Sequence, residues 1–83
     1  MKAPRVGSTV VIVAGDRVGI IGRLGSVRRG RVSIESPFVP QRWVMADLGD
    51  IAAAPHPLSW YQRVQGRHQC AGCDALQERM FAR

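Results

Sequence analysis

The sequence predicts a mainly β protein, a small five-stranded barrel followed by a short α-helical C-terminal extension. Two observations favour strands: apolar runs that contain β-branched residues occupy residues 9–13 and 20–24, and polar and apolar residues alternate along residues 31–35. A third observation favours a curved sheet, because glycines recur through and around the first two runs. Glycines inside strands mark bulges, bends or the close approach of another backbone. We expect residues 1–53 to form the barrel and residues 54–83 to form the extension.

Five strands are expected in the barrel. They lie at residues 8–13, 19–27, 31–35, 42–45 and 51–53. The loop after the first strand contains Gly15, which supplies a backbone conformation that other residues adopt at a cost. Apolar residues of the second strand do not alternate, so the sequence leaves open whether Ile20 or Ile21 points inward. The third strand is the clearest, because Val32 and Ile34 alternate with polar residues and are expected inside.

Turn-forming residues separate these strands. Residues 28–30 end in a glycine, which is typical of a tight hairpin between the second and third strands. Pro37 and Pro40 interrupt the chain after the third strand, since proline cannot donate to a hydrogen-bonded ladder. A single turn at residues 47–49 leads into the closing strand.

The extension begins where prolines interrupt residues 54–57. Beyond them, Ser59 is expected to cap a short helix over residues 60–65 that ends at Gly66. A second helix, with apolar residues on one face, is expected over residues 73–82. We expect both helices to pack on the barrel.

The spacing of glycines and aliphatic residues resembles a known motif. Its members are Gly7, Ser8, Val10, Ile12, Gly15, Gly19, Gly22 and Leu24. In this order they resemble the KOW motif of SH3-like barrels, which occurs in NusG-type transcription factors and some ribosomal proteins. Such motifs often carry a basic residue where this chain has Val18.

Later residues extend the resemblance. Those similar to the usual ending of small SH3-like barrels are Trp43, Val44, Asp47, Leu48 and Ile51. The resemblance therefore covers about residues 6–53. It implies an SH3-like barrel and an association with nucleic acid or with the machinery of transcription or translation.

Size and charge narrow the classes of function. The 83 residues suffice for one domain with a modest core. Twelve basic residues against six acidic ones give a net charge of +6, which favours approach to phosphates or to an acidic protein surface. Nearly all the basic residues are arginine, but a GC-rich genome would also encode arginine for lysine. The charge therefore carries more weight than the residue type.

The sequence also indicates a cellular location. The N-terminus lacks the apolar region of a secretory signal, and no run approaches the roughly 18 apolar residues of a membrane span. The two cysteines are too few for a disulfide scaffold. We expect a protein of the reducing cytoplasm that has no membrane partner.

The first candidate site is the arginine-rich turn between the second and third strands. The candidate binding residues for nucleic acid or a partner are Arg23, Arg28, Arg29, Arg31, Phe38 and Arg42. Guanidinium groups bind phosphate through two parallel hydrogen bonds, so a hairpin tip with three arginines suits a phosphate backbone. No acidic residue precedes Glu35 in this stretch. The alternative is a solvated polar turn.

Aromatic residues bear on how a nucleic acid would be held, because exposed rings stack on unpaired bases. Phe38 lies between two prolines in a loop, where we expect it to be exposed. Trp43 is expected to complete the barrel core, and Trp60 to anchor the extension. This distribution favours contact with the backbone over base stacking.

The second candidate site is a partial zinc motif in the extension. Cys70 and Cys73 have a spacing that places two thiolates on one zinc ion, and His68 would add a third ligand. The fourth ligand would be His56, Asp74 or a residue of a second subunit. The alternative is two free thiols at the start of a helix. Thiol oxidoreductases share this spacing, but their strand–helix context is missing here.

Other patterns of catalysis are missing from the sequence. The carboxylates are scattered, and neither a phosphate-binding Gly-Lys-Ser/Thr motif nor a nucleophile motif is present. We therefore expect no enzymatic activity and no small-molecule substrate.

Two functions remain. The first is a nucleic-acid-associated accessory factor that binds RNA, DNA or a nucleoprotein complex through the arginine-rich hairpin face. The second is a protein-interaction or assembly module that docks on an acidic surface of a larger complex, such as RNA polymerase or a viral particle.

Overall fold

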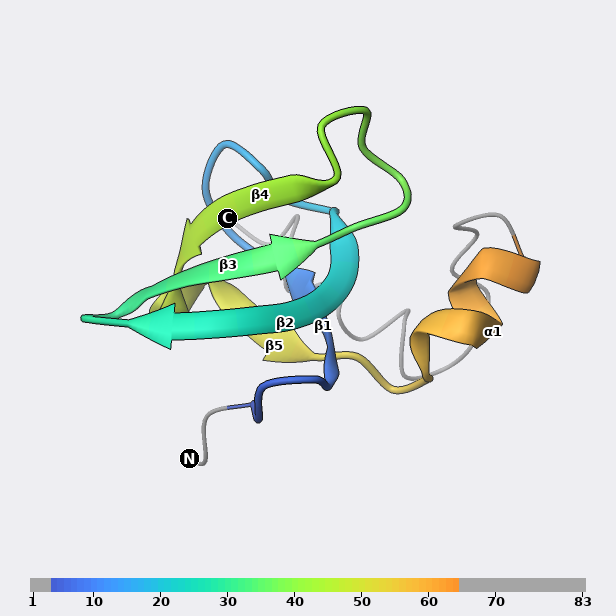
Figure 1. Ribbon diagram of the computed structural model, residues 1–83, viewed down its shortest axis with the longest axis horizontal. Helices are drawn as coiled ribbons and strands as arrows, with labels where there is room; N and C mark the ends of the chain where they lie inside the picture. Colours follow the sequence, from blue (N-terminus) through green and yellow to red (C-terminus); the bar gives the residue numbers. More distant parts are fainter. Residues whose placement is uncertain (1–3, 65–83) are drawn as a thin grey trace.

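The computed structural model describes residues 4–64, which form one antiparallel sheet of five strands with a short helix after the last strand. The strand order across the sheet is β4-β3-β2-β1-β5 (Figure 1). The elements are β1 Thr9–Ile12, β2 Ile21–Arg28, β3 Arg31–Glu35, β4 Trp43–Asp47, the 3₁₀ helix η1 Leu48–Asp50, β5 Ile51–Ala53 and α1 Leu58–Arg63. The predicted mainly β fold with a C-terminal helix is confirmed.

The strands lie close to their predicted positions. β3 and β5 have the predicted bounds, and the ends of the other strands differ by one or two residues. Gly15 has the expected left-handed backbone, with φ of +89°. The turn expected at residues 47–49 is η1, one residue later, because Asp47 still pairs with Arg31 as part of β4.

The start of α1 differs from the prediction. The helix begins at Leu58 with Pro57 at its N-cap, and no side chain caps it by a hydrogen bond. The prediction that Ser59 caps the helix was wrong, because Pro57 has a φ of −69°, close to helical values, and leads the chain into the helix two residues earlier than predicted, so Ser59 lies inside it. Gly66 and the helix expected over residues 73–82 lie outside the described residues.

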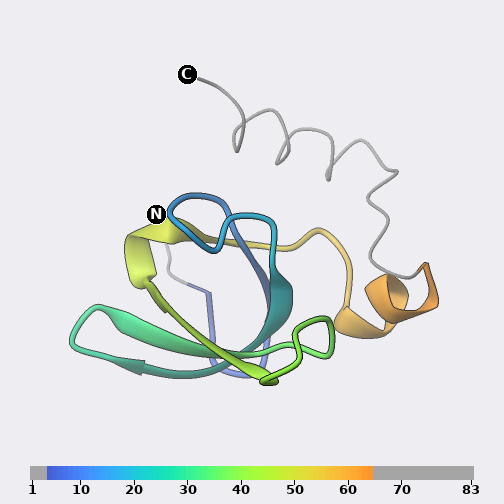
Figure 2. The ribbon, with the colours of Figure 1, turned by 90° about the horizontal axis from the view of Figure 1, so that it is seen from above.

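The sheet is strongly curved, but in the described part of the chain it is not closed. β4 and β5 are its two edge strands, and η1 joins them without a ladder between them (Figure 2). The term barrel therefore applies only loosely.

Two glycines allow β2 to bend across the sheet. At Gly22, an added Cβ would lie 2.5 Å from the Glu35 carbonyl oxygen, so only glycine permits this approach of β3. At Gly25, the pairing with β3 shifts between Leu24 and Ser26, which marks a β-bulge.

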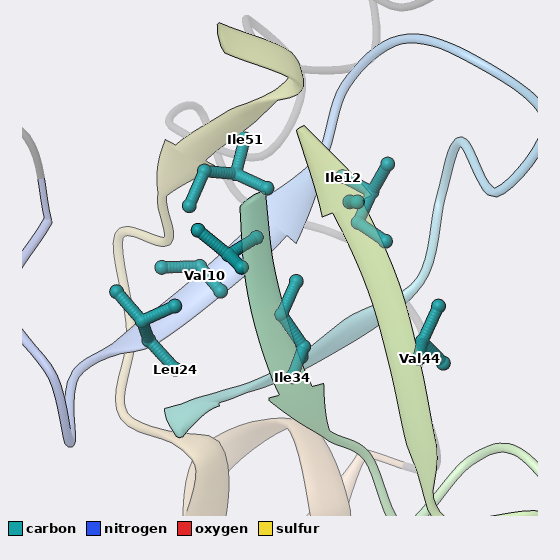
Figure 3. Packing of buried hydrophobic residues seen from close by; sticks show 8 residues of the cluster. Val10, Ile12, Leu24, Ile34, Val44 and Ile51 are labelled. Atoms are coloured by element: carbon teal, nitrogen blue, oxygen red, sulfur yellow. The ribbon is translucent and has the colours of Figure 1, made fainter. Parts of the chain in front are cut away.

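The main core lies on the concave side of the sheet (Figure 3). It consists of Val10, Ile12, Leu24, Val32, Ile34, Val44, Ala46 and Ile51. The alternation of β3 predicts the inward position of Val32 and Ile34, and both are fully buried.

A second, smaller cluster lies on the opposite side of the sheet, where α1 covers it. Val11, Val13 and Ile21 pack there with Tyr61 of α1, which is fully buried. Ile20 instead packs against the main core, so the two adjacent isoleucines serve the two clusters. None of the described helices is long or apolar enough to cross a lipid bilayer.

Candidate functional site

The β2–β3 hairpin carries the arginine-rich turn. Arg28 pairs with Arg31, which leaves Arg29 and Gly30 as a two-residue loop. Their φ values are +52° and +78°, and both positions are positive in the type I′ turn that suits the twist of a hairpin. The predicted hairpin is present, and all four residues are exposed.

The hairpin continues into an open face of the sheet that we call the outer face. Residues that pair directly across antiparallel strands point to the same side. The outer face therefore has three rows, which are Arg28, Arg31 and Asp47, then Ser26, Ser33 and Met45, then Arg23, Glu35 and Trp43. α1 covers the neighbouring part of the same side of the sheet, over β1 and the start of β2.

The register of the sheet brings a carboxylate to the arginine cluster. Arg31 Nη1 donates a hydrogen bond to Asp47 Oδ1 at 2.9 Å, with both side chains more than half exposed. This is the only ion pair among residues 4–64. The sequence showed no acidic neighbour here because Asp47 lies on a different strand. Arg28 and Arg29 have no carboxylate partner in the described part of the chain.

Trp43 lies on the outer face, with 51% of its surface exposed. The prediction that it completes the core was wrong, because β4 alternates and places Val44 and Ala46 inward instead. Its indole ring lies over Gly25, where an added Cβ would come within 2.7 Å of Cζ3. Met45, two residues along, is 53% exposed. The sequence did not identify this face, because residues 43–46 are all apolar and only their burial alternates.

Arg23, at the end of the Trp43 row, and Arg42, just before β4, come together at the edge of the outer face. They line a crevice of about 190 Å³ between the sheet and α1, with Glu35, Leu58 and Gln62 among its other walls. We call it the helix crevice. The helix crevice thus brings two of the predicted arginines close to the carboxylate of Glu35.

The loop between β3 and β4 closes one side of the helix crevice. Its buried Ser36 hydroxyl donates to the Ile21 carbonyl at 2.6 Å and accepts from the Phe38 amide at 3.2 Å. Phe38 is 40% exposed, as expected, but it projects from this loop and is not part of the outer face.

A larger hollow of about 550 Å³ runs beside β4, which is an edge strand of the sheet. We call it the edge hollow. Three carboxylates that are scattered in the sequence, Asp16, Asp47 and Asp50, contribute to its walls. Within residues 4–64, no cluster of histidine, cysteine or acidic side chains is arranged to hold a metal ion.

Of the proposed zinc ligands, only His56 lies in the described part of the chain. Its imidazole stacks on Trp60, with ring centroids 3.9 Å apart and 18° between the planes. Trp60 also packs against the second cluster, where it links the extension to the sheet. His68, Cys70, Cys73 and Asp74 lie outside the described residues.

No protein-family model, curated protein or solved structure matches this chain.

Proposed function

We propose that this protein is a non-enzymatic, nucleic-acid-associated accessory factor that contacts phosphates through the tip of the β2–β3 hairpin. The observation that carries the proposal is the pair of exposed arginines, Arg28 and Arg29, without a carboxylate partner among the described residues. Guanidinium groups held on a type I′ turn are free to meet a phosphate backbone. The net charge of +6 and the resemblance to KOW-type barrels support the same function.

Charge is distributed along the face in a way that suits this function. The hairpin tip lies at one end of the molecule and α1 at the opposite end (Figures 1 and 2). Arg31 is partly neutralised by Asp47, so the tip arginines carry most of the free positive charge of that end. The helix crevice adds Arg23 and Arg42 at the other edge of the outer face.

The test is the salt dependence of binding to a labelled oligonucleotide, for the native protein and for the double variant Arg28→Ala, Arg29→Asn. Asparagine tolerates the left-handed conformation at position 29, so the turn is retained while the charge is removed. The logarithm of the binding constant falls with the logarithm of the salt concentration, and each lost phosphate contact makes this slope shallower by about 1. The double variant is therefore expected to make the slope shallower by about 2 and to weaken binding at moderate salt.

The matched control is Arg63→Gln. Arg63 is an exposed arginine in the last turn of α1, away from the hairpin tip. A loss of affinity per removed charge that is equal for Arg63→Gln and for the double variant would show that binding follows net charge alone. Binding that survives high salt would contradict a phosphate-led contact.

A second candidate function is a protein-interaction or assembly module. The observation that favours it is the edge position of β4 beside the edge hollow. A free strand edge accepts an added strand from a partner through backbone hydrogen bonds. Purification from the native host with and without nuclease separates the two functions. A defined protein recovered after nuclease treatment supports this module, and recovery of none alongside intact nucleic-acid binding excludes it.

A further inference from the structure

We infer that Trp43 forms a base-stacking position on the outer face, so that the preferred ligand is single-stranded nucleic acid. This inference rests on the function proposed above and extends it from the phosphate backbone to the bases. Neither the arginine-rich turn nor its charge distinguishes a single strand from a duplex, whereas an exposed indole does.

The first argument is the placement of the indole ring. Trp43 is half exposed on a strand whose inward positions are filled by other residues, so it is not required by the core. Its six-membered ring reaches across β3 to the bulge of β2, where Cζ3 and Cη2 lie over Gly25. Contact with the backbone at Gly25 supports the far edge of the ring. A ring held in this way loses little conformational entropy when a base stacks on it.

The second argument is what surrounds the ring. Met45 is equally exposed beside Trp43, and next to it the Ser26 and Ser33 hydroxyls hydrogen-bond to each other at 2.6 Å. One of these two hydroxyls donates, and the other keeps a hydrogen for a base edge. The outer face thus combines an apolar platform with polar groups that are accessible to a base.

The third argument is charge complementarity on both sides of the platform. Arg28 and Arg29 lie beyond the serine row, and Arg23 and Arg42 border the helix crevice in and beside the Trp43 row. From Trp43 to the hairpin row, β4 advances by roughly 13 Å, at about 3.3 Å per residue. A short stretch of single strand can therefore place a base on Trp43 while its flanking phosphates meet arginines at each end.

A duplex cannot use this platform in the same way. Its bases are stacked on one another and present only their edges, so an indole has no base face to contact. Binding that depends on Trp43 should therefore discriminate single strands from duplexes.

The experiment compares oligo(dT) and oligo(rU) of about 12 nucleotides, a length within the usual site sizes for such proteins, with a duplex of equal length. The variants are Trp43→Leu, which removes the ring, and Trp43→Phe, which keeps one. Val18→Ala is the matched control, since Val18 is an exposed apolar residue in the loop between β1 and β2. Circular dichroism and urea unfolding confirm that each variant is folded.

Trp43→Leu is expected to weaken binding to the single strand by roughly 5- to 150-fold and binding to the duplex by less than about twofold. Trp43→Phe should recover most of the loss. Equal affinity of oligo(dT) and oligo(rU) would indicate stacking without sugar recognition, and a preference for oligo(rU) would identify RNA as the ligand. Both results support the inference.

Three outcomes would overturn it. If Trp43→Leu leaves single-strand binding unchanged while the arginine variants weaken it, the base-stacking position is wrong and the proposed function stands. If Trp43→Leu weakens binding to single strand and duplex equally, the ring supports the structure of the protein and does not stack on a base. If the native protein binds neither, both proposals fail.

A second measurement serves if Trp43→Leu does not fold. The chain contains two tryptophans, so Trp60→Phe leaves Trp43 as the only one. Stacking of a base on Trp43 quenches its fluorescence during an oligo(dT) titration. Unchanged fluorescence at saturating oligonucleotide contradicts the inference.

Discussion

At the scale of single residues, Trp43 keeps its place because Gly25 has no side chain. Any Cβ at position 25 would lie within 2.7 Å of Cζ3 and 3.1 Å of Cη2, and 3.3 Å from the Ser33 carbonyl oxygen. The carbonyl belongs to the sheet and cannot move freely, so the indole would have to leave its position. The missing side chain at Gly25 therefore permits the position of the ring at the bulge of β2.

The substitution Gly25→Ala tests this pair. We expect it to lower the free energy of unfolding by about 1 kcal/mol, the low end of the cost of overpacking, because the half-exposed indole can move aside, and to weaken single-strand binding as Trp43→Leu does. Urea unfolding measures the first effect and oligonucleotide titration the second.

Gly49→Ala provides the matched control. Nothing lies within 4 Å of the Cβ that it would add, and its backbone is not left-handed. We expect a change below about 0.5 kcal/mol. A similar loss of stability from both substitutions would mean that contact with Trp43 is not what requires glycine at position 25.

At the scale of elements, the β2–β3 hairpin places an arginine that we propose for phosphate binding in a costly backbone conformation. Arg29 has a φ of +52°, a conformation that costs an ordinary residue about 1–2 kcal/mol. The favoured residue at this position of a type I′ turn is asparagine or aspartate. A strained arginine at the tip is consistent with a side chain retained for binding.

Substitutions at Arg29 separate the turn from the charge. Arg29→Asn is expected to raise the free energy of unfolding by about 0.5–1 kcal/mol while weakening oligonucleotide binding, because it relieves the backbone and removes a guanidinium. Arg29→Val removes the same charge but places a β-branched residue at positive φ, so it should lower stability by about 1 kcal/mol or more. Thermal and urea unfolding measure both variants. Equal stability of the two would contradict the left-handed backbone at Arg29.

At the scale of the whole molecule, the two sides of the sheet have different roles. The concave side holds the main core, and the convex side is divided between the part covered by α1 and the exposed outer face. Burial of Tyr61 fixes α1 on the first part and leaves the second open. The residues that we propose for binding are therefore largely separate from those of the two clusters, so we expect charge variants at the hairpin tip to remain folded.

How much of this arrangement could be predicted depends on whether the sequence signal lies within one short stretch or between residues that are far apart in the chain. The bounds of β3 follow from its alternation, and the hairpin follows from the glycine at its turn. Both signals are local, so they are visible in one short stretch of chain.

The predictions that failed needed information from distant residues. Trp43 was assigned to the core by its hydrophobicity, but residues 43–46 are all apolar, and only the pairing of β4 with β3 shows that Val44 lies inside and Trp43 outside. The pairing of Arg31 with Asp47 depends on the register between β3 and β4, which no single stretch of sequence contains. The zinc ligands predicted in the extension remain a prediction, since three of them lie outside the described residues.

The central claim is that nucleic acid binds on the outer face and hairpin tip, and mapping the contact by NMR tests it most directly. In a titration of ¹⁵N-labelled protein with oligo(dT), we expect shifts to concentrate on the amides of β2, β3 and β4 that flank Arg28, Ser33 and Met45. The two indole N–H signals give an internal comparison, because that of Trp43 should shift and that of Trp60, which belongs to α1 and packs against the second cluster, should not. Shifts confined to α1 and the β1–β2 loop, or a Trp60 signal that moves while Trp43 stays fixed, would contradict the account.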